Sequence, residues 1–172
     1  MEHLSPLMRY IPDPIIEACL KMKKPFKVSH ITGIKSPYAE AEGWFIGCPL
    51  TAKQMVELPE EFVMDRIIES GKVAQELGAK IVGLGAFTSI VGDAGITVAK
   101  NLDIAVTSGN SYTVATAIQG TKQAARMMGK DLKECRAVVV GATGSIGAAS
   151  VRLLAKEVKH ITLVARHMGP LE

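Results

Sequence analysis

The chain has 172 residues, of which 48% are hydrophobic and 22% are charged, and its formal net charge is +3. This composition is ordinary for a globular protein with a buried core, and it excludes a disordered or low-complexity chain. So small a basic excess gives no reason to expect a nucleic-acid partner, and no apolar run is long enough to cross a bilayer.

The three cysteines, Cys19, Cys48 and Cys135, show no paired spacing such as C-x-x-C. An odd and sparse set favours a reducing compartment over a disulfide framework. Together with the four histidines, these cysteines form no spacing typical of a metal site. The first ten residues lack the basic and apolar regions of a secretory signal. We therefore expect a soluble cytoplasmic protein without a bound metal.

The stretch PDPIIEACLKMKKP predicts a short amphipathic helix that Pro25 ends. The lysines of KMKK at 21–24 suit a helix C-terminus, and an alternative interpretation is a docking point for an acidic carrier protein. Two β-rich runs follow, FKVSHITGI and EGWFIGCPL, separated by the turn-forming KSPYAEAEG. His30 in the first run is isolated, and we weigh a general-acid role against an ordinary strand position.

Pro59 predicts the start of a helix, with Glu60 and Glu61 in its first turn, and Gly78 stands where a left-handed C-cap ends it. The apolar run KIVGLGAF has the length of a buried parallel strand. AGITVAKNL then predicts a short helix, and DIAVTSG predicts a further strand.

A long helix is expected from Asn110 to Met128, because apolar residues recur on one face. AVVVG, a second helix and HITLVA complete the chain. The alternation of strands and helices from residue 43 onward predicts an α/β protein with largely parallel sheets. A boundary in GKDLKEC gives an N-terminal α/β substrate domain at 1–130 and the start of a second domain at 131–172.

The segment VVVGATGSIG places Gly141, Gly144 and Gly147 between an apolar strand and a helix. In the strict G-x-G-x-x-G register the first place falls on Ala142, so this is a G-x-x-G-x-x-G variant. Small residues let the backbone turn tightly and approach a pyrophosphate, which the N-terminus of the following helix then holds. The alternative is a strand–turn–helix that needs glycines for its shape alone.

The end of the second strand of this unit, TLVARH, carries Arg166 about twenty residues beyond the glycines. An acidic residue at this place typically binds a free ribose 2′-hydroxyl, whereas a guanidinium suits a 2′-phosphate. The sequence therefore favours NADP over NAD, with a solvated arginine at a strand end as the alternative. The predicted cofactor-binding residues are Gly141, Ala142, Thr143, Gly144, Ser145, Ile146, Gly147 and Arg166.

With LGAFTSIV, TSGNSYTVATA and VVVGATGSIG in this order, the chain resembles the long-chain acyl-[acyl-carrier-protein] reductases of cyanobacteria and their bacterial relatives. The resemblance runs from about Gly43 to Arg166 and includes the GCPL segment. It implies an N-terminal α/β substrate domain followed by a Rossmann domain. It also implies NADPH-dependent reduction of a fatty acyl thioester, carried by acyl carrier protein or coenzyme A, to a fatty aldehyde.

Members of that family are about twice as long as this chain, and the cysteine that takes the acyl group is thought to lie in their later half. The resemblance thus implies that residues 1–172 are an N-terminal half, with a nearly whole substrate domain and only the first β-α-β of the cofactor domain. The closing HMGPLE departs from the family pattern. From this reading we expect no reductase turnover from these residues alone, and association through apolar surface left exposed.

Two loops follow the carboxyl ends of apolar strands, where open α/β sheets place their ligands. Thr88 and Ser89 belong to the first loop, and Ser108 and Asn110 to the second. Hydroxyl and amide donors at a helix start suit a thioester carbonyl, so these four residues are candidate catalytic residues. The alternative is ordinary capping and turn chemistry.

Cys48 in FIGCPL matches a cysteine in the related reductases and is the weakest catalytic candidate. A thiolate there is a potential nucleophile, but no histidine lies close in sequence, and a buried structural cysteine is the alternative.

Two other functions remain open. Shikimate-type and methylene-tetrahydrofolate dehydrogenases share the two-domain plan, and an amino-acid-dehydrogenase-like oxidoreductase acting on a small substrate is one alternative. The lysine-bearing N-V-T-x-P-x-K segment of shikimate enzymes has no counterpart here, which counts against that reading. The other alternative is a non-catalytic assembly or binding fragment, which forms homo-oligomers through its first domain.

Overall fold

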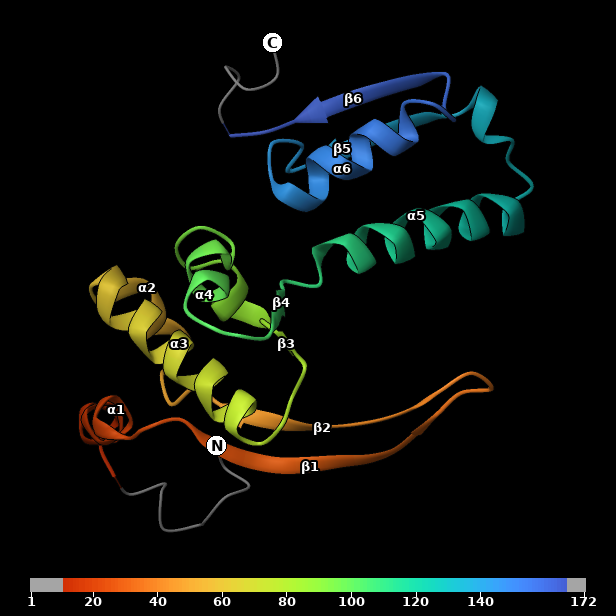
Figure 1. Cartoon of the computed structure of the whole chain (residues 1–172). Helices are drawn as coiled ribbons and strands as arrows, with labels where there is room; N and C mark the ends of the chain where they lie inside the picture. The colour runs from red at the N-terminus through yellow and green to blue at the C-terminus, as the bar shows by residue number, and fades with distance from the viewer. Residues whose placement is uncertain (1–10, 167–172) are drawn as a thin grey trace. The chain divides into compact units, whose positions relative to one another are not determined.

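The computed structural model describes residues 11–166 and divides the chain into two compact units, up to Ser108 and from Gly109 onward (Figure 1). The elements of the first unit are α1 (Asp13–Met22), β1 (Phe26–Lys35), β2 (Glu40–Gly47), α2 (Ala52–Glu57), α3 (Glu60–Glu76), β3 (Ile81–Gly83), the 3-10 turn η2 (Ala86–Ser89), α4 (Ile96–Lys100) and β4 (Ala105–Thr107). Those of the second unit are α5 (Asn110–Met127), the 3-10 turn η3 (Leu132–Glu134), β5 (Arg136–Val140), α6 (Ser145–Leu154) and β6 (His160–Val164).

Helix boundaries follow the residues that predicted them. Helix α1 ends shortly before Pro25, and α3 begins directly after Pro59, whose fixed φ suits a helix start. Gly78 and Gly129 have φ values of +92° and +64°, so each takes the left-handed conformation expected just beyond a helix. The predicted helices at these positions are confirmed.

The mixed α/β class is confirmed, but the sheets differ from the largely parallel sheet that was expected. The described residues form three separate two-stranded sheets. The pairs β3–β4 and β5–β6 are parallel, whereas β1–β2, which has the longest strands, is an antiparallel hairpin. Chain proximity explains the difference, since two strands joined by a short turn can only pair antiparallel.

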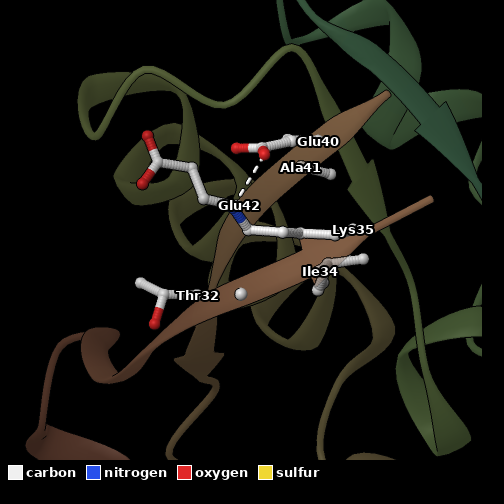
Figure 2. A pocket seen from close by; sticks show the side chains of 7 residues that line it. Thr32, Ile34, Lys35, Glu40, Ala41 and Glu42 are labelled. Atoms are coloured by element: carbon white, nitrogen blue, oxygen red, sulfur yellow. Dashed lines mark hydrogen bonds and ion pairs between the residues drawn. The ribbon is translucent and has the colours of Figure 1, made fainter. Parts of the chain in front are cut away.

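The hairpin β1–β2 is irregular along its length. Its register shifts between Lys27 and Ser29 and again between Ile31 and Ile34, as bulges cause. The second irregularity accompanies a small pocket of about 320 Å³ (Figure 2), across which Lys35 and Glu40 form an ion pair at 2.7 Å. Both side chains are largely exposed, so this pair adds about 1 kcal/mol or less to stability.

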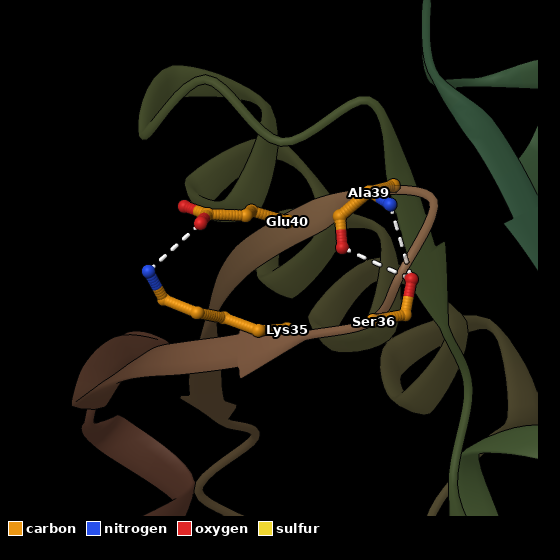
Figure 3. Close-up of polar contacts among 4 residues, drawn as sticks. All are labelled: Lys35, Ser36, Ala39 and Glu40. Atoms are coloured by element: carbon orange, nitrogen blue, oxygen red, sulfur yellow. Dashed lines mark hydrogen bonds and ion pairs between the residues drawn. The ribbon is translucent and has the colours of Figure 1, made fainter.

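The turn of the hairpin is held by one serine (Figure 3). The Ser36 hydroxyl donates to the Ala39 carbonyl at 3.1 Å and accepts from the backbone N–H groups of Tyr38 and Ala39. Serine closes turns in this way because its short side chain reaches its own backbone. The turn predicted from KSPYAEAEG is confirmed.

The core of the first unit lies between α3 and its neighbours. Val63 and Ile67 of α3 are fully buried, and Val98 of α4 is fully buried as well. Leu84, directly after β3, packs in the same cluster. This core holds residues of α3 and Leu84 in one cluster, and Ile67 and Leu84 of that cluster also line the pocket described below.

The second unit has a separate core, in which Val114 and Ile118 of α5 pack with Leu154 of α6. Helix α5 therefore belongs to the same compact unit as β5–α6–β6. The expected division at residues 130 and 131 places this helix in the first domain, so the compact units divide about one helix earlier. No helix within residues 11–166 is long and apolar enough to cross a membrane.

Candidate functional site

The glycine-rich loop of the second unit connects β5 to α6 in a parallel β-α-β unit, as the sequence predicted. Gly141 has a φ of +79°, a conformation that favours glycine. The backbone N–H groups of Gly141 and Ala142 both donate to the Val164 carbonyl at the end of β6, at 2.8 and 3.1 Å. The loop is thereby fixed to the carboxyl ends of both parallel strands, where such sheets bind ligands.

Gly144 and Gly147 differ in whether the fold has room for a side chain at their positions. A Cβ atom on Gly147 would lie 2.0 Å from the Gly141 carbonyl oxygen, so no side chain fits where α6 packs against the loop. A Cβ on Gly144 would lie 3.4 Å from the same oxygen, which is an ordinary contact, and its backbone is extended with φ −73°. The fold itself therefore requires glycine at 147 and leaves room for a side chain at 144.

Helix α6 begins with unpaired donors. Its N-cap is Gly144, which has no side chain to accept from the first turn. Within residues 11–166, no acceptor is found for the backbone N–H groups of Ser145, Ile146 and Gly147. Ser145 and Ile146 are exposed, whereas Ala142, in the first part of the loop, is buried. Exposed, unpaired N–H groups at a helix start attract an anion.

A contact that the sequence does not predict links two of its motifs. The side-chain amide of Asn110, in the first turn of α5, donates to the Ser145 hydroxyl at 2.8 Å. The N-termini of α5 and α6 therefore lie next to each other in the second unit. Asn110 was singled out as a candidate for the substrate loop, and its observed partner belongs to the glycine loop instead. Its catalytic role stays a prediction.

Arg166 follows β6 by two residues and is exposed. The last residue of that strand, Val164, holds the start of the glycine loop through its carbonyl group. Arg166 is thus two residues along the chain from the carbonyl group that holds the loop, which is where a residue that recognises the cofactor ribose is expected.

The other predicted loops lie at one end of the parallel pair β3–β4, and the Leu84 N–H donates to the Thr107 carbonyl at 2.8 Å there. The Thr88 hydroxyl donates to the Gly85 carbonyl at 2.8 Å and accepts from the Gly85 N–H at 3.0 Å. The Ser89 hydroxyl donates to the carbonyl of Ala86. These hydroxyls stabilise the turn η2, and a direct role in catalysis for Thr88, Ser89 or the half-buried Ser108 stays a prediction.

A pocket of about 760 Å³ lies wholly in the first unit. It is lined by residues 42–46 of β2, by residues 78–85 around β3, and by one side of α3. Cys48 and Thr88, which the sequence singled out separately, both line it. Sequence reasoning missed the pocket because its walls come from segments with no local motif in common.

Cys48 is half-buried beside α3. Burial raises the pKa of its thiol above the ordinary value, and the Ser70 hydroxyl and the Arg66 guanidinium oppose this in part. A raised pKa keeps the thiol protonated at neutral pH, and the thiolate is the nucleophilic form. The arrangement therefore favours the structural role for Cys48 that was its alternative.

Thiol labelling tests this assignment. At pH 7 we expect iodoacetamide to modify the exposed Cys19 on the order of tenfold faster than Cys48, because Cys19 is more accessible and the raised pKa of Cys48 lowers the fraction of its thiolate. Mass spectrometry of peptides from timed samples measures the two rates, and in denaturant the two rates should become equal. Faster labelling of Cys48 in the folded protein would restore it as a candidate nucleophile.

His30 has a local partner in the hairpin. Its Nε2 atom lies 3.1 Å from the Glu42 carboxylate, and its ring stacks on Trp44 with centroids 5.4 Å apart. This exposed cluster explains the residue as a cross-strand pair. Among residues 11–166, no group of three or more histidine, cysteine or acidic side chains is placed to hold a metal ion.

Two of the relatives found by comparison with known proteins are distant enzymes. The chain is 34% identical over 128 residues to aminotransferase PigE of Serratia sp., covering 74% of this chain and 14% of that protein. It is 30% identical over 123 residues to the long-chain acyl-[acyl-carrier-protein] reductase of Synechococcus elongatus, covering 62% of this chain and 34% of that protein. No family model matches the sequence.

The chain thus spans about a third of the reductase and a smaller share of the aminotransferase. Both relatives are named as enzymes, which is consistent with an enzymatic origin for this chain. The similarity to the reductase agrees at family level with the resemblance seen in the motifs. The match covers 14% of the aminotransferase, so its similarity to this chain gives no evidence for aminotransferase activity in the matched part.

Proposed function

We propose that the protein is an NADP-dependent reductase of fatty acyl thioesters, which forms a fatty aldehyde. The observation that best supports NADP binding is the loop 141–147. It packs closely on α6 at Gly147 and leaves unpaired N–H groups at the start of that helix. The reductase relative supports the substrate class. The β-α-β unit is then the start of a Rossmann domain.

The residues fit a dinucleotide at this loop. The backbone N–H groups of Ser145, Ile146 and Gly147 would hold the pyrophosphate, and Gly144 leaves the backbone accessible to it. Thr143 is exposed and adds a hydroxyl, and Arg166 would pair with the 2′-phosphate. When bound, NADPH supplies the hydride for reduction of the acyl carbonyl.

The partners follow from the substrate. We propose acyl carrier protein or coenzyme A as the carrier of the acyl group. A cytoplasmic location stays a prediction from the cysteine count.

Val138, Val140 and Val164 are exposed on one face of β5–β6. An uncovered apolar face of this kind supports the self-association expected from the sequence.

Cofactor binding is the first test, because the resemblance places the acyl-accepting cysteine outside residues 1–172. We expect calorimetric titration of the purified protein to show NADPH binding that is tighter than NADH binding. When NADPH and a hexadecanoyl thioester are added, we expect no aldehyde from residues 1–172 alone. Absence of NADPH binding would contradict the proposal.

The same preparation separates the alternatives. Pyridoxal phosphate bound as a Schiff base to a lysine gives a characteristic absorbance, which is expected of an aminotransferase and not of this reductase. Cofactor reduction with a small hydroxy acid or amino acid in place of a thioester would favour the dehydrogenase alternative. No observation on residues 11–166 favours either function over the acyl-thioester reductase.

A further inference from the structure

The 760 Å³ pocket of the first unit is lined by unbroken runs of residues, 42–46 in β2 and 78–85 around β3. Successive side chains of a strand point to opposite faces, so a pocket over the face of a sheet is lined mainly by every second residue. An unbroken run is what the edge of a strand presents. The pocket therefore runs along one edge of β2 and one edge of β3.

Both of these edges lack a strand partner in the part of the chain that the structure describes. Strand β2 pairs with β1 alone, and β3 pairs with β4 alone. An unpaired edge presents a row of backbone N–H and C=O groups that an extended ligand with amide groups can bind. The sides of the pocket thus favour a ligand with amides along its length.

The floor of the pocket is apolar. Met55, Ile67 and Leu84 line it and are buried in the core of the unit. Two polar side chains in the wall already have partners within the protein. The Ser70 hydroxyl donates to the Arg66 carbonyl at 2.8 Å, and the Thr88 hydroxyl is paired with the Gly85 backbone. An aliphatic chain suits a floor of this composition.

One glycine stands in each strand wall, Gly43 in β2 and Gly83 in β3. A Cβ on either would meet no atom within 4 Å, and neither has a positive φ. The fold therefore requires glycine at neither position. The register of the hairpin shifts beside Gly43, and glycine in a strand is common at such a bulge as well as where a ligand or another backbone approaches closely. Gly83 stands beside no such irregularity.

We propose that this pocket binds the acyl-pantetheine arm of the substrate in an extended conformation, with its amides along the edges of β2 and β3 and its aliphatic chain over the apolar floor. The identity of the acyl group rests on the proposed reductase function. The volume lies within the range of about 300–1,000 Å³ typical of small-molecule sites. Coenzyme A and acyl carrier protein share this arm.

Binding of S-dodecyl-pantetheine, a thioether that can be neither hydrolysed nor reduced, tests the inference without any chemistry. Calorimetry should show saturable binding at least about tenfold tighter than that of dodecanoate or of pantetheine alone, because each half adds its own contacts. Lengthening the alkyl chain should raise the affinity by up to about fourfold per buried methylene group. S-dodecyl-coenzyme A and the S-dodecyl carrier protein then show which carrier adds affinity.

Three variants carry the same substitution. Gly43→Phe and Gly83→Phe each add bulk where a strand wall lines the pocket, and each should weaken binding of S-dodecyl-pantetheine at least about tenfold. Gly120→Phe, in the other unit and equally open around its Cβ, is the matched control and should bind as the wild type does. Aromatic residues favour strands, and thermal melting confirms that the pocket variants fold.

Wild-type affinity in both folded pocket variants would overturn the inference, as would equal affinity for dodecanoate and S-dodecyl-pantetheine. A shift from dimer to monomer in both variants, with no binding of the thioether by the wild type, would instead assign the two edges to a second copy. NADPH binding, measured separately, reports on the reductase proposal. Failure of the thioether to bind would therefore count against the pocket inference alone, and failure of NADPH to bind would count against the reductase proposal.

Discussion

Replacement of Gly144 by valine is expected to weaken NADPH binding at least about 100-fold while leaving the second unit folded. A Cβ at this position has room within the protein, because its nearest neighbour is an oxygen 3.4 Å away. The added side chain would instead stand over the exposed start of α6 and keep the phosphates from its N–H groups. Loss of two hydrogen bonds to a charged group, at about 1.5–3 kcal/mol each, gives an effect of this size.

Gly147 supplies the contrast, since alanine at 147 should damage the fold rather than the ligand site alone. Its Cβ would lie 2.0 Å from the Gly141 carbonyl oxygen, so α6 must shift away from the loop. Overpacking of this kind typically destabilises by about 1–3 kcal/mol. Chemical denaturation should therefore separate Gly147→Ala from Gly144→Val, whose stability should fall by about 1 kcal/mol or less.

Gly120→Val, in α5 with open space around its Cβ, serves as the control for the binding measurement, and its NADPH affinity should equal that of the wild type. Unchanged nucleotide affinity in Gly144→Val would remove the cofactor assignment from the loop. The loop would then have only the structural role that its glycines also explain.

Local signals predicted the boundaries of helices well, because proline and glycine act on their own backbone. Pro59 and Gly78 delimit α3 through a fixed φ and a left-handed φ, and neither effect depends on distant residues. The β-α-β unit at the end of the chain was predicted for the same reason. Its two strands, its tight loop and its helix lie within thirty consecutive residues.

Strand pairing was less predictable, because it depends on contacts between distant segments. KIVGLGAF has the composition of a buried strand, yet only Ile81–Gly83 forms β3, and the Ile81 side chain is 59% exposed. An apolar run shows that burial is favourable and does not show which partner provides it. One edge of β3 remains without a strand in the described chain, and the pocket lies there.

In the candidate site, too, local features were predictable and contacts between distant residues were not. The strand, turn and helix around residues 141–147 were predicted because a compact motif carries the whole signal, and the cofactor role of the loop stays a prediction. The hydrogen bond from Asn110 to Ser145 joins residues 35 positions apart, and the sequence gives only their separate tendencies to begin helices. Thr88 bonds to the backbone of Gly85 within one turn, as the capping alternative requires, and its catalytic role stays a prediction.

Replacement of Arg166 by aspartate is expected to reverse the cofactor preference. NADPH and NADH differ by the 2′-phosphate, and an exposed guanidinium two residues beyond β6 is placed to pair with that group. Loss of a charge-assisted hydrogen bond, at about 1.5–3 kcal/mol, weakens binding roughly 10- to 150-fold. Repulsion between aspartate and the phosphate acts in the same direction, whereas NADH has no group there to lose.

The reversal is measured as the ratio of NADPH to NADH affinity, by calorimetry at a fixed ionic strength because screening weakens long-range charge effects. Arg152→Asp is the matched control, since Arg152 is an exposed arginine of α6 and its replacement changes the net charge equally. That control should lower both affinities slightly and leave their ratio within about twofold of the wild type. An equal loss of NADPH and NADH binding in Arg166→Asp would show that Arg166 does not read the 2′-phosphate. A preference for NADP would then need another cation.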